Sequence, residues 1–481
     1  MRKTVNIWFA MLAGLLVCGV PAYAQKGAAP AAPSMSAILT EVEGEAVNWL
    51  QGLIRINTTN PPGNELVAAK YVAAILEHEG IPSEIYESTP GRGFLVARLS
   101  SGAMPDPSRA LLLLGHLDVV GVERAKWSTE PFGGAISNGY LWGRGTVDDK
   151  SMAVANLAVL VALKRSGARL NRDVILVAEG DEEAGGTVGM RFAVEKHWDK
   201  MAAGYALNEG GRVVLKDGKV QYVGVQAGEK VMVNVDVIAT GVSGHASTPR
   251  KDNPVAHLAT AIAKIAAYDA PVQYNSLTRA YFESIAATED DETAKWMRAL
   301  ESSDRADHAA RWISAASPVW NSMLRDTIAP TMLEAGVRQN VVPSEARGVL
   351  NIRLLPGNLL DPLLGKLRDL INDPQIRFEI EPGGSQPAPS SSLDSDLFKT
   401  IARVSGQEYP GAPIVPYMST GATDSAFLRA RSVQAYGLLP FALTDEDAAR
   451  MHGVDERIPL DSFRQGIEFL YNIVSDFAVA K

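Results

Sequence analysis

Apolar positions along the chain occur either in short unbroken runs or with helical spacing. Unbroken runs at 93–99, 110–114 and 173–178 predict buried strands. Helical spacing predicts helices over 36–53 and 152–164. Strands that alternate with helices are typical of a layered α/β domain. We therefore expect the first part of the chain to form such a domain.

A second region interrupts this alternation. A strand over 231–238, a helix over 254–267 and a strand over 348–354 predict a smaller α+β domain inserted into the first. The charged stretch 274–325 carries tryptophans at helix-compatible intervals, which predicts helices that decorate the insert and keep these tryptophans in its core. The tryptophans are Trp296, Trp312 and Trp320.

The chain then returns to the first domain. A Pro/Ser/Gly-rich stretch at 381–392 is the expected linker, and a helix over 397–404 resumes the first domain. The predicted organisation has five parts: a signal peptide (1–24), a flexible tether (25–35), the first part of the main domain (36–228), the insert (229–382) and the second part of the main domain (383–481).

The first residues have the pattern of a secretion signal. A basic start at Arg2 and Lys3 precedes an apolar run and an Ala-x-Ala site that ends at Ala24. The run is shorter than a membrane span, so we expect no membrane anchor and a periplasmic or secreted protein. Cys18 is the one cysteine and lies within the signal, so the processed chain is expected to have no disulfide and no thiol ligand.

Composition and net charge indicate a multidomain globular protein and argue against a nucleic-acid partner. With 481 residues, 46% hydrophobic and 21% charged, the chain is long and apolar enough for two or three globular domains. Its net charge of −9 repels polyanions, and the sequence has no basic stripe. We therefore expect no nucleic-acid partner.

Three of the seven histidines, His116, His245 and His452, stand in glycine-punctuated loops or at strand ends, while the others lie in helical stretches. His116 follows the buried run 110–114, and open α/β sheets place their sites at such strand ends. Asp118, two residues on, could orient the imidazole of a metal ligand, although His-x-Asp also occurs in surface turns.

Acidic residues gather at two further loops. Asp148 and Asp149 follow two glycines and precede a predicted helix, so Asp148 could bridge two cations, or either residue could simply cap the helix. The run 179–186 crowds acids at a strand end, where they repel unless a cation or a shared proton relieves them. This run therefore indicates a metal site with one acid left free for proton transfer.

Glu209 and His452 each stand beside glycine and complete a set of two histidines and three carboxylates, with one spare glutamate. Nitrogen and oxygen donors without sulfur suit zinc or another borderline divalent metal.

Together these motifs resemble metallopeptidase family twenty, the co-catalytic zinc amidohydrolases that include acetylornithine deacetylase, succinyl-diaminopimelate desuccinylase, aminoacylase and carboxypeptidase S. The matching motifs are His116-x-Asp118, Gly143-Arg144-Gly145-x-x-Asp148-Asp149-Lys150, Asp181-Glu182-Glu183-x-Gly185 and His452-Gly453. The resemblance implies a zinc-peptidase-like α/β/α catalytic domain with an inserted α+β dimerisation or lid domain. It further implies two Zn²⁺ ions, which Co²⁺ or Mn²⁺ could replace, and a homodimer.

The resemblance also implies a role for each motif residue. Asp148 would bridge the metals, His116 and Glu209 would complete one site, and Glu183 and His452 would complete the other. Glu182 would be the general base and Asp118 would lie behind His116. A cis peptide between Asp148 and Asp149 is expected as well. Glu209, where some relatives carry aspartate, favours the aminoacylase and carboxypeptidase S branch.

In the insert, the resemblance assigns His245 to the active site of the partner subunit and Asn340 and Arg353 to substrate binding. Gly421 and Thr423, in the sequence Gly-Ala-Thr-Asp, resemble the loop that lines the substrate pocket. Without the family these residues would be a turn-capping amide, a surface charge on a strand and ordinary turn residues.

The expected reaction is hydrolysis of the amide bond of short peptides or N-acyl amino acids with a free carboxylate, by metal-bound hydroxide with Glu182 as base. The alternative from another class is an exported ligand-binding protein that kept the fold and lost catalysis. A further alternative keeps the metals but cleaves a different bond, such as an ester.

Overall fold

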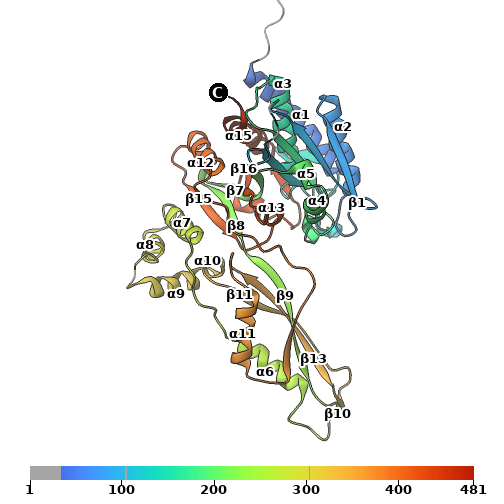
Figure 1. Cartoon of the computed structure of the whole chain (residues 1–481), viewed down its shortest axis with the longest axis vertical. Coiled ribbons are helices and arrows are strands. Elements are labelled where there is room, and N and C mark those ends of the chain that lie inside the picture. The colour runs from blue at the N-terminus through green and yellow to red at the C-terminus, as the bar shows by residue number, and fades with distance from the viewer. Residues whose placement is uncertain (1–33, 103, 105, 303, 481) are drawn as a thin grey trace, which may run out of the picture.

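The computed structural model describes residues 34–480 except 103, 105 and 303. The predicted signal peptide, Cys18 and most of the predicted tether lie outside the described residues. Figure 1 shows a larger α/β body and a smaller body that extends away from it.

The larger body is built on an eight-stranded mixed sheet in the order β1-β2-β6-β3-β7-β16-β8-β15. β3 is parallel to both β6 and β7, and β16 is parallel to β7, whereas β2 is antiparallel to β6. The strands are β1 (Ser83–Thr89), β2 (Arg92–Leu99), β3 (Leu111–His116), β6 (Val174–Glu179), β7 (Tyr205–Lys216), β8 (Lys219–Glu229), β15 (Ile414–Ser419) and β16 (Gln434–Leu443).

Helices cover both faces of this sheet. Leu111 and Leu113 of β3 belong to one apolar core and Leu112 and Leu114 to another, because successive side chains of a strand point to opposite faces. The first core packs against α1 (Met35–Ile54), α2 (Glu65–His78), α3 (Lys150–Ser166), α12 (Asp396–Glu408) and α15 (Leu460–Ala478). The second packs against α4 (Met190–Lys196), α5 (Trp198–Met201) and α13 (Ser425–Arg429).

Several short strands and helices lie in the loops that connect the elements of the main sheet. A small sheet has the order β17-β5-β4. These elements are β4 (Ala135–Ser137), β5 (Tyr140–Trp142), β17 (Arg457–Pro459), α14 (Asp445–Ala448) and the 3₁₀ helices η1 (Arg124–Lys126) and η2 (Glu182–Ala184).

The smaller body is a four-stranded antiparallel sheet in the order β11-β13-β9-β14. Val235 and Val237 of β9 and Leu350 of β13 form an apolar core with the buried faces of helices α6 and α11. The elements are β9 (Val231–Thr240), β11 (Thr327–Ala335), β13 (Glu345–Leu354), β14 (Ile376–Ile380), α6 (Pro254–Ala266) and α11 (Leu360–Ile371). A two-stranded pair, β10 (Gly244–His245) and β12 (Val341–Val342), lies at its far end (Figure 1).

A helical segment contradicts one expectation. It consists of α7 (Ser276–Ile285), α8 (Asp291–Ala299), α9 (Ala306–Ala316) and α10 (Pro318–Met323). We expected it to decorate the insert, but α7 packs against β15, the edge strand of the main sheet (Figure 1). Its core contains Val415 of β15, because that edge offers apolar surface to cover. Trp296, Trp312 and Trp320 are half-buried around this core rather than inside it.

The predicted elements agree with the observed ones to within a few residues at each end. The fold class is confirmed, since a mixed α/β sheet and a separate antiparallel α+β unit are both present. None of the helices in the described part of the chain is long and apolar enough to cross a membrane.

Candidate metal centre

The candidate centre lies where the parallel strands end. β3 ends at His116, and β6 pairs beside it and leads into η2, which carries Glu182 and Glu183. Glu209 lies on β7 two residues beyond Leu207, the last β7 residue that pairs with β3. Open α/β sheets bind ligands at this edge because loops diverge there.

Asp148 lies between two histidines. Its Oδ1 is 2.9 Å from His116 Nε2 and its Oδ2 is 2.9 Å from His452 Nε2. Glu183 Oε2 is 3.2 Å from the same nitrogen of His452. Ligands at about 2.0–2.1 Å from one tetrahedral zinc ion lie about 3.3 Å apart. Each oxygen of Asp148 is thus placed to reach a separate ion.

Two groups of donor atoms share His116. His116, Asp148 and Glu183 form one, and His116, Glu182 and Glu209 form the other, with ligand atoms within 4.8 Å of one another in each group. These groups contain four of the five expected ligands, but they differ from the expected pairs, because His116 groups with Glu183 as well as with Glu209 and because Glu182, the expected base, lies within the second group.

The electrostatics of the cluster fit divalent ions. Burial, reinforced by neighbouring carboxylates, raises the pKa of Glu182 and of Glu209 well above the ordinary value. Glu183 Oε1 is buried and has no hydrogen-bond partner among the described residues. A cation would relieve the crowding and occupy that unpaired oxygen, and the nitrogen and oxygen donors suit zinc-like metals.

Asp118 was expected to orient the imidazole of His116 with its carboxylate, but its backbone carbonyl lies nearer. His116 Nδ1 lies 3.0 Å from the backbone oxygen of Asp118 and 3.5 Å from its carboxylate Oδ1. The backbone carbonyl is therefore the nearer group that orients the imidazole. The Asp118 carboxylate accepts hydrogen bonds from the backbone N–H groups of Glu182 and Glu183, each at 3.2 Å. Asp118 thus holds the turn that carries both glutamates.

Asp149 occupies the N-cap position of α3, but its side chain makes no capping hydrogen bond. Its Oδ2 instead accepts the backbone N–H of His116 at 3.2 Å. The alternative of a plain capping role is therefore wrong for Asp149. The peptide between Asp148 and Asp149 is cis, as expected.

Sequence reasoning missed Glu456, which is fully buried behind the Asp148 loop. Its Oε1 accepts the backbone N–H groups of Val147 at 2.7 Å and Asp148 at 3.1 Å. Its Oε2 accepts from Gly145 N–H at 3.1 Å and from Arg144 Nη1 at 2.5 Å. The only signal in the sequence was its place four residues after His452.

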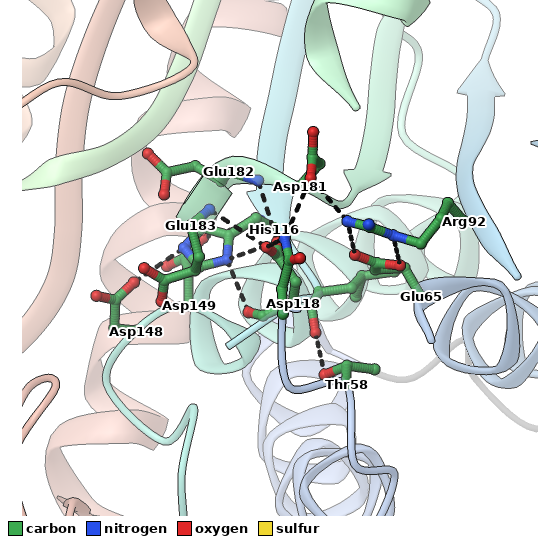
Figure 2. A network of polar contacts seen from close by, with 12 residues as sticks. Thr58, Glu65, Arg92, His116, Asp118, Asp148, Asp149, Asp181, Glu182 and Glu183 are labelled. Atoms are coloured by element: carbon green, nitrogen blue, oxygen red, sulfur yellow. Dashed lines mark hydrogen bonds and ion pairs between the residues drawn. The ribbon is translucent and has the colours of Figure 1, made fainter. Parts of the chain in front are cut away.

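A second missed group, of which Figure 2 labels Glu65 and Arg92, supports Asp118 and Asp181. Asn60 donates to the carboxylates of Asp118 at 2.8 Å and Asp181 at 3.1 Å. Arg92 donates to Glu65 and, at 2.8 Å, to Asp181 (Figure 2). These contacts join residues far apart in sequence, and no local motif announces them.

The expected substrate-binding residues divide into two sets. Arg353, Gly421 and Thr423 line a cavity of about 520 Å³ that also contains Glu182 and His452. Thr423 Oγ1 donates to Glu229 at 2.8 Å, which fixes this loop.

His245 and Asn340 lie elsewhere. His245 ends β10 and Asn340 directly precedes β12; both are exposed, and Ala246 N–H donates to Asn340 O at 3.0 Å. Figure 1 places β10 at the end of the smaller body that is remote from the main sheet. Within a single chain, neither residue lines the cavities at the metal centre.

Comparison with known proteins supports the same family. A probable carboxypeptidase S-like 2 of Dictyostelium discoideum is 28% identical over 386 residues, which cover 76% of this chain and 72% of that protein. The N-fatty-acyl-amino acid synthase/hydrolase PM20D1 of Xenopus tropicalis is 28% identical over 381 residues, with the same coverage of 76% and 72%.

The fold is similar to that of the M20 family metallo-carboxypeptidase Sso-CP2 of Sulfolobus solfataricus, with a TM-score of 0.68 and 20% identity over 90% of this chain and 99% of that chain. Residues 112–476, well over half of the chain, match Peptidase family M20/M25/M40. They include the strand ends, the acidic turn and His452 that form the centre. The chain therefore belongs to Peptidase family M20/M25/M40 and is a hydrolase of the metallopeptidase and aminoacylase type.

Proposed function

We propose that this protein is an exported dinuclear zinc amidohydrolase that cleaves short peptides or N-acyl amino acids with a free carboxylate. The observation that carries the proposal is Asp148, whose two carboxylate oxygens face His116 and His452 at 2.9 Å each. A carboxylate shared in this way is the usual bridge of a two-metal hydrolytic site.

Five side chains of the centre would hold the ions. Asp148 would bridge the ions, His116 and Glu209 would complete one site, and Glu183 and His452 would complete the other. Bound there, the ions polarise the scissile carbonyl and make water more acidic. Co²⁺ and Mn²⁺ are accepted by the same donor types.

Glu182 serves as the general base and then as the general acid. It takes a proton from the attacking water and gives it to the leaving amine nitrogen, so that the carbonyl carbon gains an oxygen as its bond to nitrogen breaks. Burial and the nearby carboxylate of Glu209 raise the pKa of Glu182 in the metal-free cluster.

Arg353 binds the carboxylate of the substrate. Its guanidinium contacts Asn351 Oδ1 at 3.0 Å and the Thr420 carbonyl at 3.4 Å. No carboxylate of the described residues pairs with it, so its charge is available to an anion in the cavity. Arginine recognises carboxylates through paired charge-assisted hydrogen bonds.

His245 acts from the partner subunit of a homodimer. A single chain leaves its imidazole exposed and outside the cavities at the centre, bonded only to its own loop through Ser247 Oγ at 2.7 Å. A second copy that brings the β10–β12 pair to the centre would add a donor for the oxyanion of the tetrahedral intermediate.

The test is metal analysis combined with turnover. Zinc-loaded protein should hydrolyse members of a panel of N-acyl amino acids and dipeptides more readily than the matched esters relative to their uncatalysed rates. Glu182→Gln should keep its metal and lose at least about 100-fold in kcat, whereas the adjacent Glu183→Gln should lose metal. Tight substrate binding without turnover by the wild type would instead establish a binding protein.

A further inference from the structure

The cavity that contains Arg353 lies between the two bodies of the chain. Arg353 belongs to β13 of the smaller body, whereas Gly421 and Thr423, which also line this cavity, follow β15 of the main sheet. The Arg353 guanidinium reaches across, since its Nη1 donates to the Thr420 carbonyl at 3.4 Å. The position of Arg353 relative to the loop 420–424 therefore depends on how the smaller body is attached to the larger one.

Lys230 joins the two sheets. β8 of the main sheet ends at Glu229 and β9 of the smaller sheet begins at Val231, so Lys230 alone separates the two strands. Its backbone N–H donates to the carbonyl of Ser419, the last residue of β15, at 3.0 Å. Glu229 accepts the backbone N–H of Thr423 at 3.0 Å and its hydroxyl at 2.8 Å. This joint therefore also holds the loop on the main-body side of the cavity.

The side chain of Lys230 reaches a second connection between the bodies. The residue is 0% exposed, and its Nζ donates to the carbonyls of Ser322 and Arg325, each at 2.9 Å, and to Thr327 Oγ1 at 3.0 Å. Three acceptors match the three protons of an ammonium group. They lie where α10, which belongs to the helical segment on the main sheet, leads into β11 of the smaller sheet. Lys230 thus ties one connection to the other.

The second connection continues directly beside Arg353. In the smaller sheet Arg353 is the register partner of Thr327 on β11 and of Met232 on β9. A shift at the start of β11 is therefore passed to Arg353 across one strand spacing of about 4.8 Å. Burial lowers the pKa of Lys230 to about 7, nearby Asp326 opposes this change and the charge of Arg353 adds to it. The two cationic side chains are therefore neighbours.

A simple space-filling role does not account for the Lys230 amine. Lysine is rarely buried completely, because removal of its charge from water costs free energy. The three partners of the amine are two carbonyls and a hydroxyl, and none of them carries a charge. An apolar side chain would fill the same space without that cost. What the amine adds is a fixed placement of the three groups to which it donates.

We propose that Lys230 is a positioning residue for Arg353: by tying the start of β11 to the joint between β8 and β9, it holds the Arg353 guanidinium where a substrate carboxylate can reach it. This inference rests on the proposed function, in which Arg353 binds that carboxylate. Lys230 and Thr327 line neither cavity at the metal centre. They therefore act on substrate affinity through Arg353 and not on the breaking of the amide bond.

The test removes one hydrogen bond of Lys230 at a time. Thr327→Val deletes the hydroxyl that accepts from Lys230 and keeps the shape of the side chain. In zinc-loaded protein it should raise KM for an N-acyl amino acid at least about fivefold and leave kcat within about twofold, because a charge-assisted hydrogen bond to the carboxylate weakens. KM for the corresponding carboxamide should change less than about twofold. Thr327→Ser keeps the hydroxyl and should restore the wild-type KM.

Thr331→Val is the matched control. Thr331 lies further along the same strand, and its hydroxyl donates to the Val349 carbonyl at 3.4 Å instead of accepting from Lys230. This variant should leave KM and kcat within about twofold of the wild type. Lys230→Met removes all three hydrogen bonds and should raise KM for the acid further than Thr327→Val does. Thermal unfolding checks the folding of every variant, and Thr327→Val decides the question if Lys230→Met does not fold.

A double-mutant cycle shows whether Thr327 acts through Arg353. In an Arg353→Ala background, Thr327→Val should raise KM for the acid less than about twofold, whereas the effects of independent sites add. Equilibrium binding of the same acid to zinc-loaded Glu182→Gln protein that carries these substitutions gives a readout independent of turnover, and it should show the same lack of additivity.

The outcomes separate this inference from the proposed function. Additive effects of Thr327→Val and Arg353→Ala, or equal effects of Thr327→Val on acid and carboxamide, would overturn the assignment of Lys230, while amide hydrolysis by the wild type would leave the proposed function intact. Absence of turnover with every amide would overturn the proposed function, and the binding cycle would still decide the assignment of Lys230.

Discussion

The carboxylate of Glu456 accepts the backbone N–H of Asp148 at 3.1 Å, although 308 residues of chain separate the two. The same carboxylate accepts the N–H groups of Gly145 and Val147 and pairs with Arg144, which is 2% exposed. One buried side chain thus fixes the backbone of the loop that presents the carboxylate proposed to bridge the metals.

Glu456→Gln should destabilise the protein by about 2–3 kcal/mol, because the buried Arg144 charge loses its anionic partner and keeps only the Gly453 carbonyl at 2.8 Å and the face of the Trp127 ring. Urea unfolding of metal-free protein measures this. Glu130→Gln is the control, since Glu130 pairs with Arg124 on the surface, and it should cost less than about 1 kcal/mol. Equal costs for the two variants would contradict the role of Glu456.

Metal stoichiometry should separate the bridging residue from a terminal ligand. Asp148→Asn weakens both sites and should leave little bound metal after dialysis. Glu209→Gln removes a ligand from one site and should lose about half of the metal. Plasma emission spectroscopy on protein of known concentration measures both. Full metal content in the Asp148→Asn protein would show that this carboxylate does not bridge.

The proposed homodimer predicts complementation between inactive subunits. His245→Ala should keep its metal and lower kcat, because the imidazole is proposed to stabilise the oxyanion in the partner subunit. Mixing His245→Ala with Glu182→Gln subunits should restore activity, since one site of the heterodimer combines an intact base with an intact histidine. Subunits that exchange, shown by mass spectrometry of a labelled chain, without regained turnover would rule out a shared site.

Arg353→Ala should raise KM at least about tenfold for an N-acyl amino acid and leave metal content unchanged. The corresponding carboxamide, which has no anion for the guanidinium, should be affected less than about twofold. Arg353→Lys keeps the charge and should recover part of the loss. An equal rise in KM for acid and carboxamide would show that Arg353 shapes the cavity without binding the carboxylate.

Stability should depend on pH through Glu43 of α1. Burial, together with the nearby Glu468 carboxylate, raises the pKa of Glu43 to about 7 from 4.5. A raised folded-state pKa favours the protonated folded form, so this contribution is full below about pH 4.5 and is lost as pH rises through about 7. Glu43→Gln, which stays neutral, should therefore exceed the wild type in unfolding temperature at pH 8 and match it near pH 4.5. The exposed Glu77→Gln of α2 is the control and should show no such divergence.

The sequence predicted the helices and strands and the loops where candidate ligands gather, because both depend on local pattern. Strand ends and glycine-bounded loops place His116, Glu183 and His452 where a site is expected, and the resemblance to a known family then assigns each a role. Long-range partners leave no such pattern. Glu456 and Asn60 act through contacts 308 and 58 residues away, and their neighbours in sequence give no periodicity that identifies them.

The helical segment was misplaced for a related reason. Its amphipathic spacing was visible, but spacing reveals that a helix has an apolar face without revealing which surface covers it. Val415 of β15, which completes that core, follows the segment by about a hundred residues of chain. The surface that these helices cover exists only once the main sheet has folded and exposed its edge strand β15.

The order of the ligands along the chain also has a consequence for biosynthesis. His116 is synthesised early, but His452 comes late and is followed by α15, which packs against α3 directly behind the Asp148 loop. A nascent chain that has not reached this point has one imidazole and a set of mutually repelling carboxylates. The proposed centre therefore cannot assemble before His452 has been added to the chain.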